Sequence, residues 1–351
     1  MEHCRLPLEL LELIITYTIP DHDLALPSHS AEVKTLHSCL FLCKGTVPFV
    51  QELLYRSCLY IDDPLQLHQL VRSYSIETPL SLRKPRKIFA SQRMLLAPFS
   101  GYSILEPEVV TNLSLLFQII GPNLKHLTID MPLRYNPPLD PEDEDMDPDP
   151  SPIRTQLRSA FTNLTGLKEL VSIKDELYLA STFHLRIDQP QIWPNYSFLK
   201  RLALYNSMID DILVEGLKAL PNLTNLVLTR PDSDGAEGLL LLTHLRKPLL
   251  KIVIFTTWED LKNCFWNLSW YPRTSISPQD VDADELAKIR TLCYEDVMGL
   301  SRGPHAVPQF DEVAACQNWI RCRALDGTLW DHEGITLDRT GRELNDEELY
   351  S

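Results

Sequence analysis

The spacing of apolar residues in the first 56 positions predicts three short helices. The first helix, which Pro20 closes, has two apolar faces at helical spacing. One face holds Leu10, Leu13, Ile14 and Tyr17. The other face holds Leu8, Leu11 and Ile15. A helix with two apolar faces needs two covers, of which one can be its own domain and the other a second protein. The alternative is that both faces pack inside a larger helical domain.

The second and third helices follow a polar link over residues 21–30. Apolar residues at helical spacing predict the second helix over 33–43, and Gly45 is expected to end it in the left-handed conformation. Thr46 is placed to cap a third helix that reaches Arg56. A unit this small cannot bury three amphipathic helices completely, and such units are often completed by a partner.

Five segments in the middle of the chain share the pattern Leu-x-x-Leu-x-apolar. Their central residues are Leu127, Leu170, Leu202, Leu226 and Val253. The last two intervals lie within the range of about 20–29 residues that is typical of leucine-rich repeats, and the first two need insertions. The pattern predicts irregular repeats whose parallel strands form a curved solenoid with one exposed sheet face. The alternative is an ordinary α/β domain with leucine-rich strands.

Helical patterns lie between and before these segments. Asp210 and Asp211 are placed to start a helix, and residues 235–245 are expected to form another. Residues 56–61 alternate like a strand that begins the same sheet, and a further helix is expected to open at Pro64. In the last part of the chain we expect helices over 280–300 and 310–325 and a strand pair over 330–337.

Two stretches of the N-terminal region resemble a known family. Leu6-Pro7-x-Glu9-Leu10-Leu11-x-x-Ile14 resembles the opening of the F-box, and Leu36-x-x-Cys39-x-x-Leu42-Cys43-Lys44 is similar to its second half. The likeness covers about residues 5–61, in the form common in fungal F-box proteins. Thr46 stands where the family usually has Trp, and the link over 20–32 is longer than usual.

The resemblance implies a fold and a partner. F-box domains dock onto the Skp-type adaptor of a cullin–RING ubiquitin ligase, the SCF complex. By this resemblance the residues in or near the adaptor interface are Leu6, Pro7, Leu10, Leu11, Ile14, Leu42 and Cys43. The expected α/β chain is then an F-box over 1–56, an irregular leucine-rich-repeat region over 57–260 with a disordered acidic insert at 137–152, and a helical or mixed α/β cap over 261–351.

Composition narrows the possible partners. The chain has 33 basic and 48 acidic side chains and a net charge of −15, which argues against binding to nucleic acid or to an anionic membrane. No apolar stretch reaches the ~18 residues of a membrane span, and the N-terminus lacks the pattern of a signal peptide. The eight cysteines include no CxxC pair, so we expect reduced thiols in the cytoplasm or nucleus.

Three weaker signals each allow two interpretations. The insert at 137–152 is expected to be a disordered loop, with attraction of a basic partner as the alternative. The basic run 83–87 resembles a nuclear-import patch, but a solvated loop is favoured. Cys39 and Cys43 could bind a metal with His37, but without a second ligand pair a packed thiol pair is favoured. We therefore expect no metal and no cofactor.

These patterns favour a protein without catalytic activity of its own. No phosphate-binding loop, GxSxG or HExxH motif is present. The favoured function is a substrate-recognition adaptor of an SCF-type ligase, whose repeats bind a protein substrate that the sequence does not identify. One alternative is a leucine-rich-repeat interaction scaffold unrelated to ubiquitination. Another is an enzyme whose site is built from scattered residues of the middle and C-terminal regions.

Overall fold

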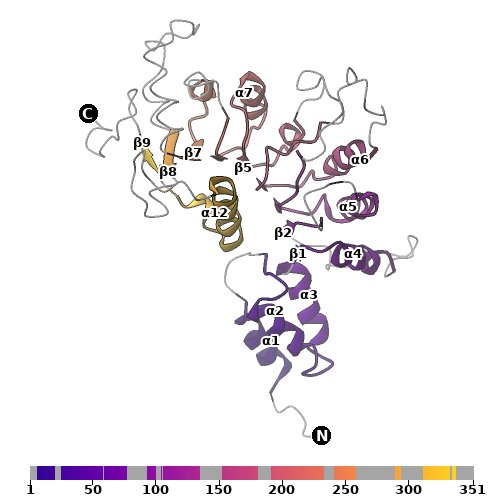
Figure 1. Cartoon of the computed structure of the whole chain (residues 1–351). Helices are drawn as coiled ribbons and strands as arrows, with labels where there is room; N and C mark the ends of the chain where they lie inside the picture. Colours follow the sequence, from indigo (N-terminus) through magenta and orange to yellow (C-terminus); the bar gives the residue numbers. More distant parts are fainter. Residues whose placement is uncertain are drawn as a thin grey trace, which may run out of the picture.

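Three N-terminal helices precede a single open sheet, so the fold is α/β (Figure 1). The computed structural model describes residues 6–19, 25–57, 59–76, 93–99, 104, 106–134, 152–180, 191–232, 241–257, 289–293, 311–332 and 334–336. The predictions for residues 20–24, the basic run 83–87, the acidic insert up to 151 and residues 337–351 lie outside this part of the chain. Among the described residues, no helix has the length and hydropathy that crossing a bilayer requires.

The three predicted N-terminal helices are present and form what we call the N-terminal module. They are α1 (Leu8–Thr16), α2 (Ala31–Cys39) and α3 (Val47–Ser57). Ser30 caps α2, since its hydroxyl accepts a hydrogen bond from the backbone N–H of Val33 at 3.3 Å. The core of the module is small and consists of Ile15, Leu36, Val50 and Leu53, with partly buried neighbours.

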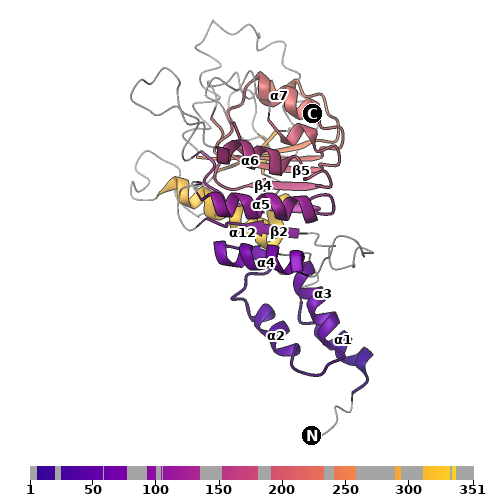
Figure 2. The ribbon, with the colours of Figure 1, turned by 90° about the vertical axis from the view of Figure 1, so that its right-hand side faces the viewer.

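The long link between α1 and α2 helps to join the module to the sheet. Ala25 in this link is buried against Tyr60 and Leu95, which belong to the first two strands. At residue 25 the link therefore packs against the first two strands of the sheet. In Figure 2 the module stands at one end of the sheet, beyond helix α4 (Pro64–Ile76).

The described strands form one sheet whose spatial order follows the sequence. Strands β1 to β8 are parallel, and β9 is antiparallel to β8. The strands are β1 (Tyr60–Ile61), β2 (Arg93–Leu96), β3 (His126–Ile129), β4 (Glu169–Ser172), β5 (Arg201–Tyr205), β6 (Asn225–Thr229), β7 (Lys251–Thr256), β8 (Ile289–Cys293) and β9 (Ile335–Thr336).

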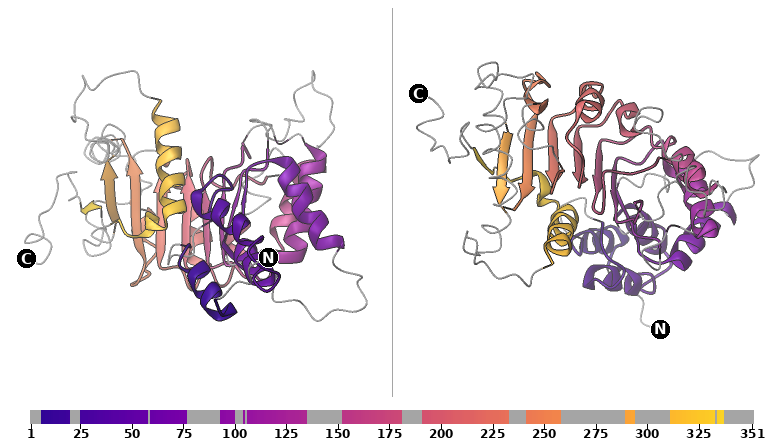
Figure 3. Two further views of the ribbon diagram at one scale, coloured as in Figure 1. Left: turned by 90° about the horizontal axis from the view of Figure 1, so that it is seen from below. Right: turned by 45° about the horizontal axis from the view of Figure 1, so that its top comes forward.

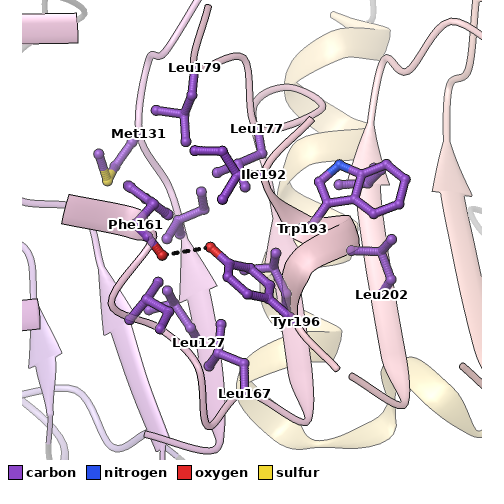
Figure 4. Close-up of a cluster of buried hydrophobic side chains, with 14 of the residues drawn as sticks. Leu127, Met131, Phe161, Leu167, Leu177, Leu179, Ile192, Trp193, Tyr196 and Leu202 are labelled. Atoms are coloured by element: carbon purple, nitrogen blue, oxygen red, sulfur yellow. Dashed lines mark hydrogen bonds between the residues drawn. The ribbon is translucent and has the colours of Figure 1, made fainter. Parts of the chain in front are cut away.

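Helices cover the outer side of the arc that the strands follow (Figures 1 and 3). They are α4, α5 (Pro107–Ile120), α6 (Pro152–Phe161) and α7 (Asp211–Lys218). The predicted start of α7 is confirmed, because the Asp210 carboxylate accepts from the backbone N–H of Leu213 at 2.9 Å. The connection from β4 to β5 contains the 3-10 turn η2 (Trp193–Asn195), after which Tyr196 donates to the Phe161 carbonyl at 2.9 Å (Figure 4).

Four of the five predicted leucine segments occupy equivalent positions in the sheet. Leu127, Leu170, Leu202 and Leu226 are register partners on neighbouring strands. The fifth partner is Ile252, so the prediction for Val253 is wrong by one residue. Because side chains alternate between the faces of a strand, this shift places Val253 on the inner side of the arc.

The inner face of the sheet is covered by the chain itself. Helix α12 (Glu312–Asp326) lies across this face (Figure 3). Its Trp319 ring stacks on Phe255 with centroids 4.2 Å apart, and its Ile320 is buried in the same cluster as Val171, Val227 and Val253. The predicted exposed sheet face is therefore wrong for the strands that this cluster contains.

The C-terminal part of the chain extends the sheet. The helix predicted over 280–300 is wrong at 289–293, which form β8 beside β7. The helix predicted over 310–325 is confirmed as α12. The second strand of the predicted pair over 330–337 is β9, but its partner is β8, and Trp330 ends a 3-10 turn, η5 (Thr328–Trp330).

Candidate docking surface

Helix α1 shows one apolar face to solvent. Leu10, Leu13, Ile14 and Tyr17 are between 45% and 80% exposed, whereas Ile15 on the opposite side is 2% exposed. The two faces predicted from the sequence therefore have different surroundings. One contributes to the small core of the module, and no described residue covers the other. Such a concentration of exposed apolar side chains on one helix is typical of a protein interaction site.

The turn between α2 and α3 depends on a buried threonine. Thr46 is fully buried, and its hydroxyl lies 2.9 Å from the Cys43 carbonyl and 3.2 Å from the Cys39 carbonyl, to either of which it can donate. The Thr46 carbonyl also accepts from the backbone N–H of Val50 at 2.9 Å. A small polar residue thus fixes the end of α2 to the start of α3 at the position where the F-box family usually has Trp.

Gly45 does not adopt the predicted left-handed conformation, since the described glycines with positive φ are Gly327 and Gly334. The physical reason for glycine is a close approach instead. A Cβ atom at residue 45 would lie 3.2 Å from Cδ1 of Leu8. The start of α1 therefore packs against the α2–α3 turn, which brings together the two stretches that the sequence singled out.

We call the combined exposed face of α1 and the α2–α3 turn the outer apolar surface. Its members are Leu6, Leu8, Leu10, Leu13, Ile14, Tyr17, Phe41 and Leu42. Of the predicted interface residues, five are exposed, namely Leu6, Pro7, Leu10, Ile14 and Leu42. Leu11 and Cys43 are half-buried, and Cys43 lies beside Thr46 with 3.9 Å between Sγ and Oγ1.

Phe41 is the member of this surface that sequence reasoning missed. It is 88% exposed, the most of the large apolar side chains in the module. A signal was present, because Leu40, Phe41 and Leu42 are consecutive and cannot all face one core at a helix end. Leu13 and Tyr17 were recognised as part of the apolar face but were not among the predicted interface residues. Leu8 was placed on the opposite face with Ile15, but it is 39% exposed at the start of α1.

The described residues offer no metal site. No three His, Cys, Asp or Glu side chains within the described ranges come close enough together to hold an ion. Cys39 and Cys43 are free thiols. Hydrogen bonds from the backbone and hydroxyl of Thr46 lower the pKa of Cys43. In the described part of the module, the distinguishing feature is therefore the outer apolar surface.

The sheet has a second distinctive surface at the amino ends of its strands. Lys125, Lys168 and Lys200 precede β3, β4 and β5, and backbone hydrogen bonds of 2.8 Å align Lys168 with Lys125 and Lys200 with Lys168. The residue after each of these lysines belongs to a row of register partners that runs across the sheet from β2 to β7. We call this row the rung, and it consists of Arg93, His126, Glu169, Arg201, Asn225 and Lys251. We call the cations of these two rows the basic edge, which consists of Arg93, Lys125, Lys168, Lys200, Arg201 and Lys251.

The positive charges of the basic edge help to lower the pKa of His126. Burial, together with the charges of Arg93, Arg201, Lys168 and Lys125, lowers the pKa of His126 to about 3. The one carboxylate of the rung, Glu169, is 1% exposed. It lies 3.1 Å from Arg93 and 2.5 Å from Arg201. His126 is therefore neutral near pH 7, and the surrounding cations are only partly balanced.

The opposite edge of the sheet is acidic, but its carboxylates are paired. Asp130 lies 3.2 Å from Lys174 and 3.1 Å from Arg321, the latter on α12. Glu176 lies 2.7 Å from Arg134. Burial and the neighbouring Glu176 raise the pKa of the fully buried Asp175 to about 7. Asp130 and Glu176 are thus ion-paired within the chain, and Asp175 accepts a hydrogen bond from the backbone N–H of Leu177, whereas the lysines of the basic edge form no ion pair with a described residue.

Comparison with known proteins adds no relative. No model of a known protein family matches the chain, and no curated protein matches it. The outer apolar surface and the basic edge are therefore the features of the described residues that bear on function.

Proposed function

We propose that this chain is a substrate-recognition adaptor of an SCF-type ubiquitin ligase. In this proposal the N-terminal module is an F-box whose outer apolar surface docks onto a Skp-type adaptor. The rest of the chain is an irregular leucine-rich-repeat solenoid that binds a protein substrate. Other subunits of the ligase supply the chemistry of ubiquitin transfer.

The supporting observation is the exposed face of α1. Leu10, Leu13 and Ile14 stay about half exposed although the module has a core of its own to which Ile15 contributes. The α2–α3 turn lies beside the start of α1 and adds Leu42 to the same surface. This geometry agrees with the interface that the F-box resemblance implies, and the buried Thr46 gives the turn a stable form without the usual Trp.

The energetics are compatible with a stable complex. Full burial of an apolar side chain contributes roughly 1.5–3 kcal/mol, and about half of that remains available for each half-exposed member of the outer apolar surface. Its eight members therefore supply roughly 6–12 kcal/mol before the losses of association, which are about 4–15 kcal/mol. Polar contacts at the rim and full occlusion of Phe41 and Tyr17 would decide the final affinity.

Co-purification with a Skp-type adaptor tests the proposal. The wild-type chain is expected to retain the adaptor, and Leu10→Asp/Ile14→Asp is expected to lose it, because two carboxylates would be buried without partners. A matched control is Leu65→Asp/Leu249→Asp, which changes two exposed leucines outside the module. This control is expected to bind the adaptor like the wild type. Failure of the wild-type chain to bind would end the proposal.

The same experiment separates the ligase proposal from an interaction scaffold unrelated to ubiquitination. A scaffold needs no partner at the outer apolar surface, so Leu10→Asp/Ile14→Asp would leave all of its associations intact. An adaptor of the ligase loses the Skp-type subunit in this variant and still binds its substrate. Affinity purification with the proteasome inhibited would show both associations together.

A further inference from the structure

The basic edge is a positive surface in an acidic protein. The whole chain has a net charge of −15, yet six cations of two adjacent rows share this edge with one carboxylate, Glu169. Glu169 is used by Arg93 and Arg201. Among the described residues, Lys168, Lys200 and Lys251 form no ion pair, and Lys168 and Lys200 are exposed. Three lysines are thus available for an anionic partner.

The rest of the inner face limits where a partner can bind. Helix α12 fills the middle of that face through Trp319 and Ile320, so a partner cannot lie on the centre of the sheet. The basic edge is at the amino ends of the strands, beyond this cluster. The Trp330 ring packs against this inner cluster and lies 5.5 Å from the Arg201 guanidinium.

We propose that the basic edge binds an extended acidic segment of a partner protein. The strands that carry Lys168, Lys200 and Lys251 run from β4 to β7, which is three strand intervals or about 14 Å at ~4.8 Å per interval. An extended peptide of about four residues has this length. Its Asp or Glu side chains would pair with Lys168, Lys200 and Lys251. Since the chain as a whole has a net charge of −15, a long polyanion such as a nucleic acid would be repelled beyond the basic edge.

Binding of an acidic segment would specify the kind of substrate that the proposed adaptor recognises. If the chain is a ligase adaptor, the acidic segment belongs to the substrate, and in that sense the inference rests on the proposed function. The binding itself needs no Skp-type subunit, because the outer apolar surface belongs to the N-terminal module and the basic edge to the sheet. Loss of one association therefore leaves the other measurable.

Fluorescence anisotropy with the full-length chain tests the inference. The probe is a labelled peptide of about eight residues with alternating Glu and Gly, and the same peptide with Gln in place of Glu is the neutral control. We expect the Glu peptide to bind, with an affinity that falls as salt is added, and the Gln peptide not to bind. Lys168→Glu/Lys200→Glu should weaken binding of the Glu peptide roughly tenfold or more.

A control variant distinguishes binding at the basic edge from a general effect of net charge on peptide binding. Lys34→Glu/Lys44→Glu changes the net charge by the same amount on the N-terminal module and should bind the peptide like the wild type. Equal losses in both variants would overturn the proposal, because binding would then follow net charge alone. Absence of binding by the wild type would also overturn it. So would tighter binding of a single-stranded oligonucleotide than of the Glu peptide.

The acidic residues at the C-terminus define one more outcome. Strand β9 ends at Thr336 beside Arg290 of β8, and several acids follow in the sequence. Asp346→Asn/Glu347→Gln/Glu348→Gln removes three of its acids in the full-length chain. If the Glu peptide bound only to this variant, the occupant of the edge would be the chain's own tail and not a partner.

Discussion

The N-terminal module and the sheet treat their apolar side chains in opposite ways. In the module, α1 buries Ile15 and leaves Leu10, Leu13 and Ile14 about half exposed. In the sheet, α4 to α7 cover the outer side, and α12 covers the inner side with Trp319 and Ile320. The chain covers the inner face of its sheet with the fifteen-residue helix α12, but no described residue covers the outer face of α1. Exposed apolar surface is thus concentrated where a partner is proposed.

The largest effect that this comparison predicts concerns two aromatic residues. Trp319→Ala removes the ring that stacks on Phe255 and should lower the free energy of unfolding by about 3–5 kcal/mol. Tyr17→Ala, on the outer apolar surface, should change it by less than about 0.5 kcal/mol. Urea unfolding of the two variants measures both values. Similar losses would mean that the outer face of α1 contributes to stability, and the contrast between the two regions would be lost.

An intermediate effect is expected from pH. The folded-state pKa of His126 is about 3, below its unfolded value near 6.5, so only the unfolded state takes up a proton between these values. Stability from the neutral imidazole is therefore present above about pH 6.5 and is lost as the pH falls toward 3. At pH 5 the loss should be roughly 2 kcal/mol relative to pH 7.

His126→Asn isolates this contribution, because asparagine does not titrate. The variant should lose less stability than the wild type between pH 7 and pH 5 when both are unfolded by urea. Equal slopes for the two proteins would show that the positive field of the basic edge does not act on the imidazole. That result would also weaken the case for the edge as a binding surface.

The smallest effect is expected at the α2–α3 turn. Thr46→Val keeps the shape of the side chain but removes the hydroxyl shared by the Cys39 and Cys43 carbonyls. Each carbonyl keeps a backbone bond, from Leu42 and from Thr46 itself, so the loss should be about 1 kcal/mol. Hydrogen exchange of the Val50 amide measures it locally. Thr46→Ser retains the hydroxyl and should protect this amide more than Thr46→Val does.

Local patterns were enough to predict the elements that depend on nearby residues. Asp210 caps α7 as expected, and Leu127, Leu170, Leu202 and Leu226 lie in neighbouring strands of one sheet. Caps and helical periodicity involve residues only a few positions apart, so the sequence contains them directly. The exposure of one face of α1 could also be predicted from nearby residues, because the helix has two apolar faces and both could not be buried in so small a core.

Elements that depend on distant partners could not be predicted in this way. Ile289, Leu292 and Cys293 fit a helical pattern, but pairing with β7 makes their segment a strand. The burial of Val227 beneath α12 depends on a helix far along the chain, although the run Leu226-Val227-Leu228 is typical of a strand buried on both faces. The basic edge, too, exists only once the register aligns residues from β2 to β7.

The position of α12 has a consequence for synthesis of the protein. Trp319 follows Phe255 by 64 residues, so translation at about 5–20 residues per second separates the two by roughly 3–13 s. During that interval the ribosome has already released the apolar strands that α12 will cover. Nascent chains therefore present an uncovered apolar face of the sheet for several seconds, and we expect them to need chaperone protection until helix α12 has emerged.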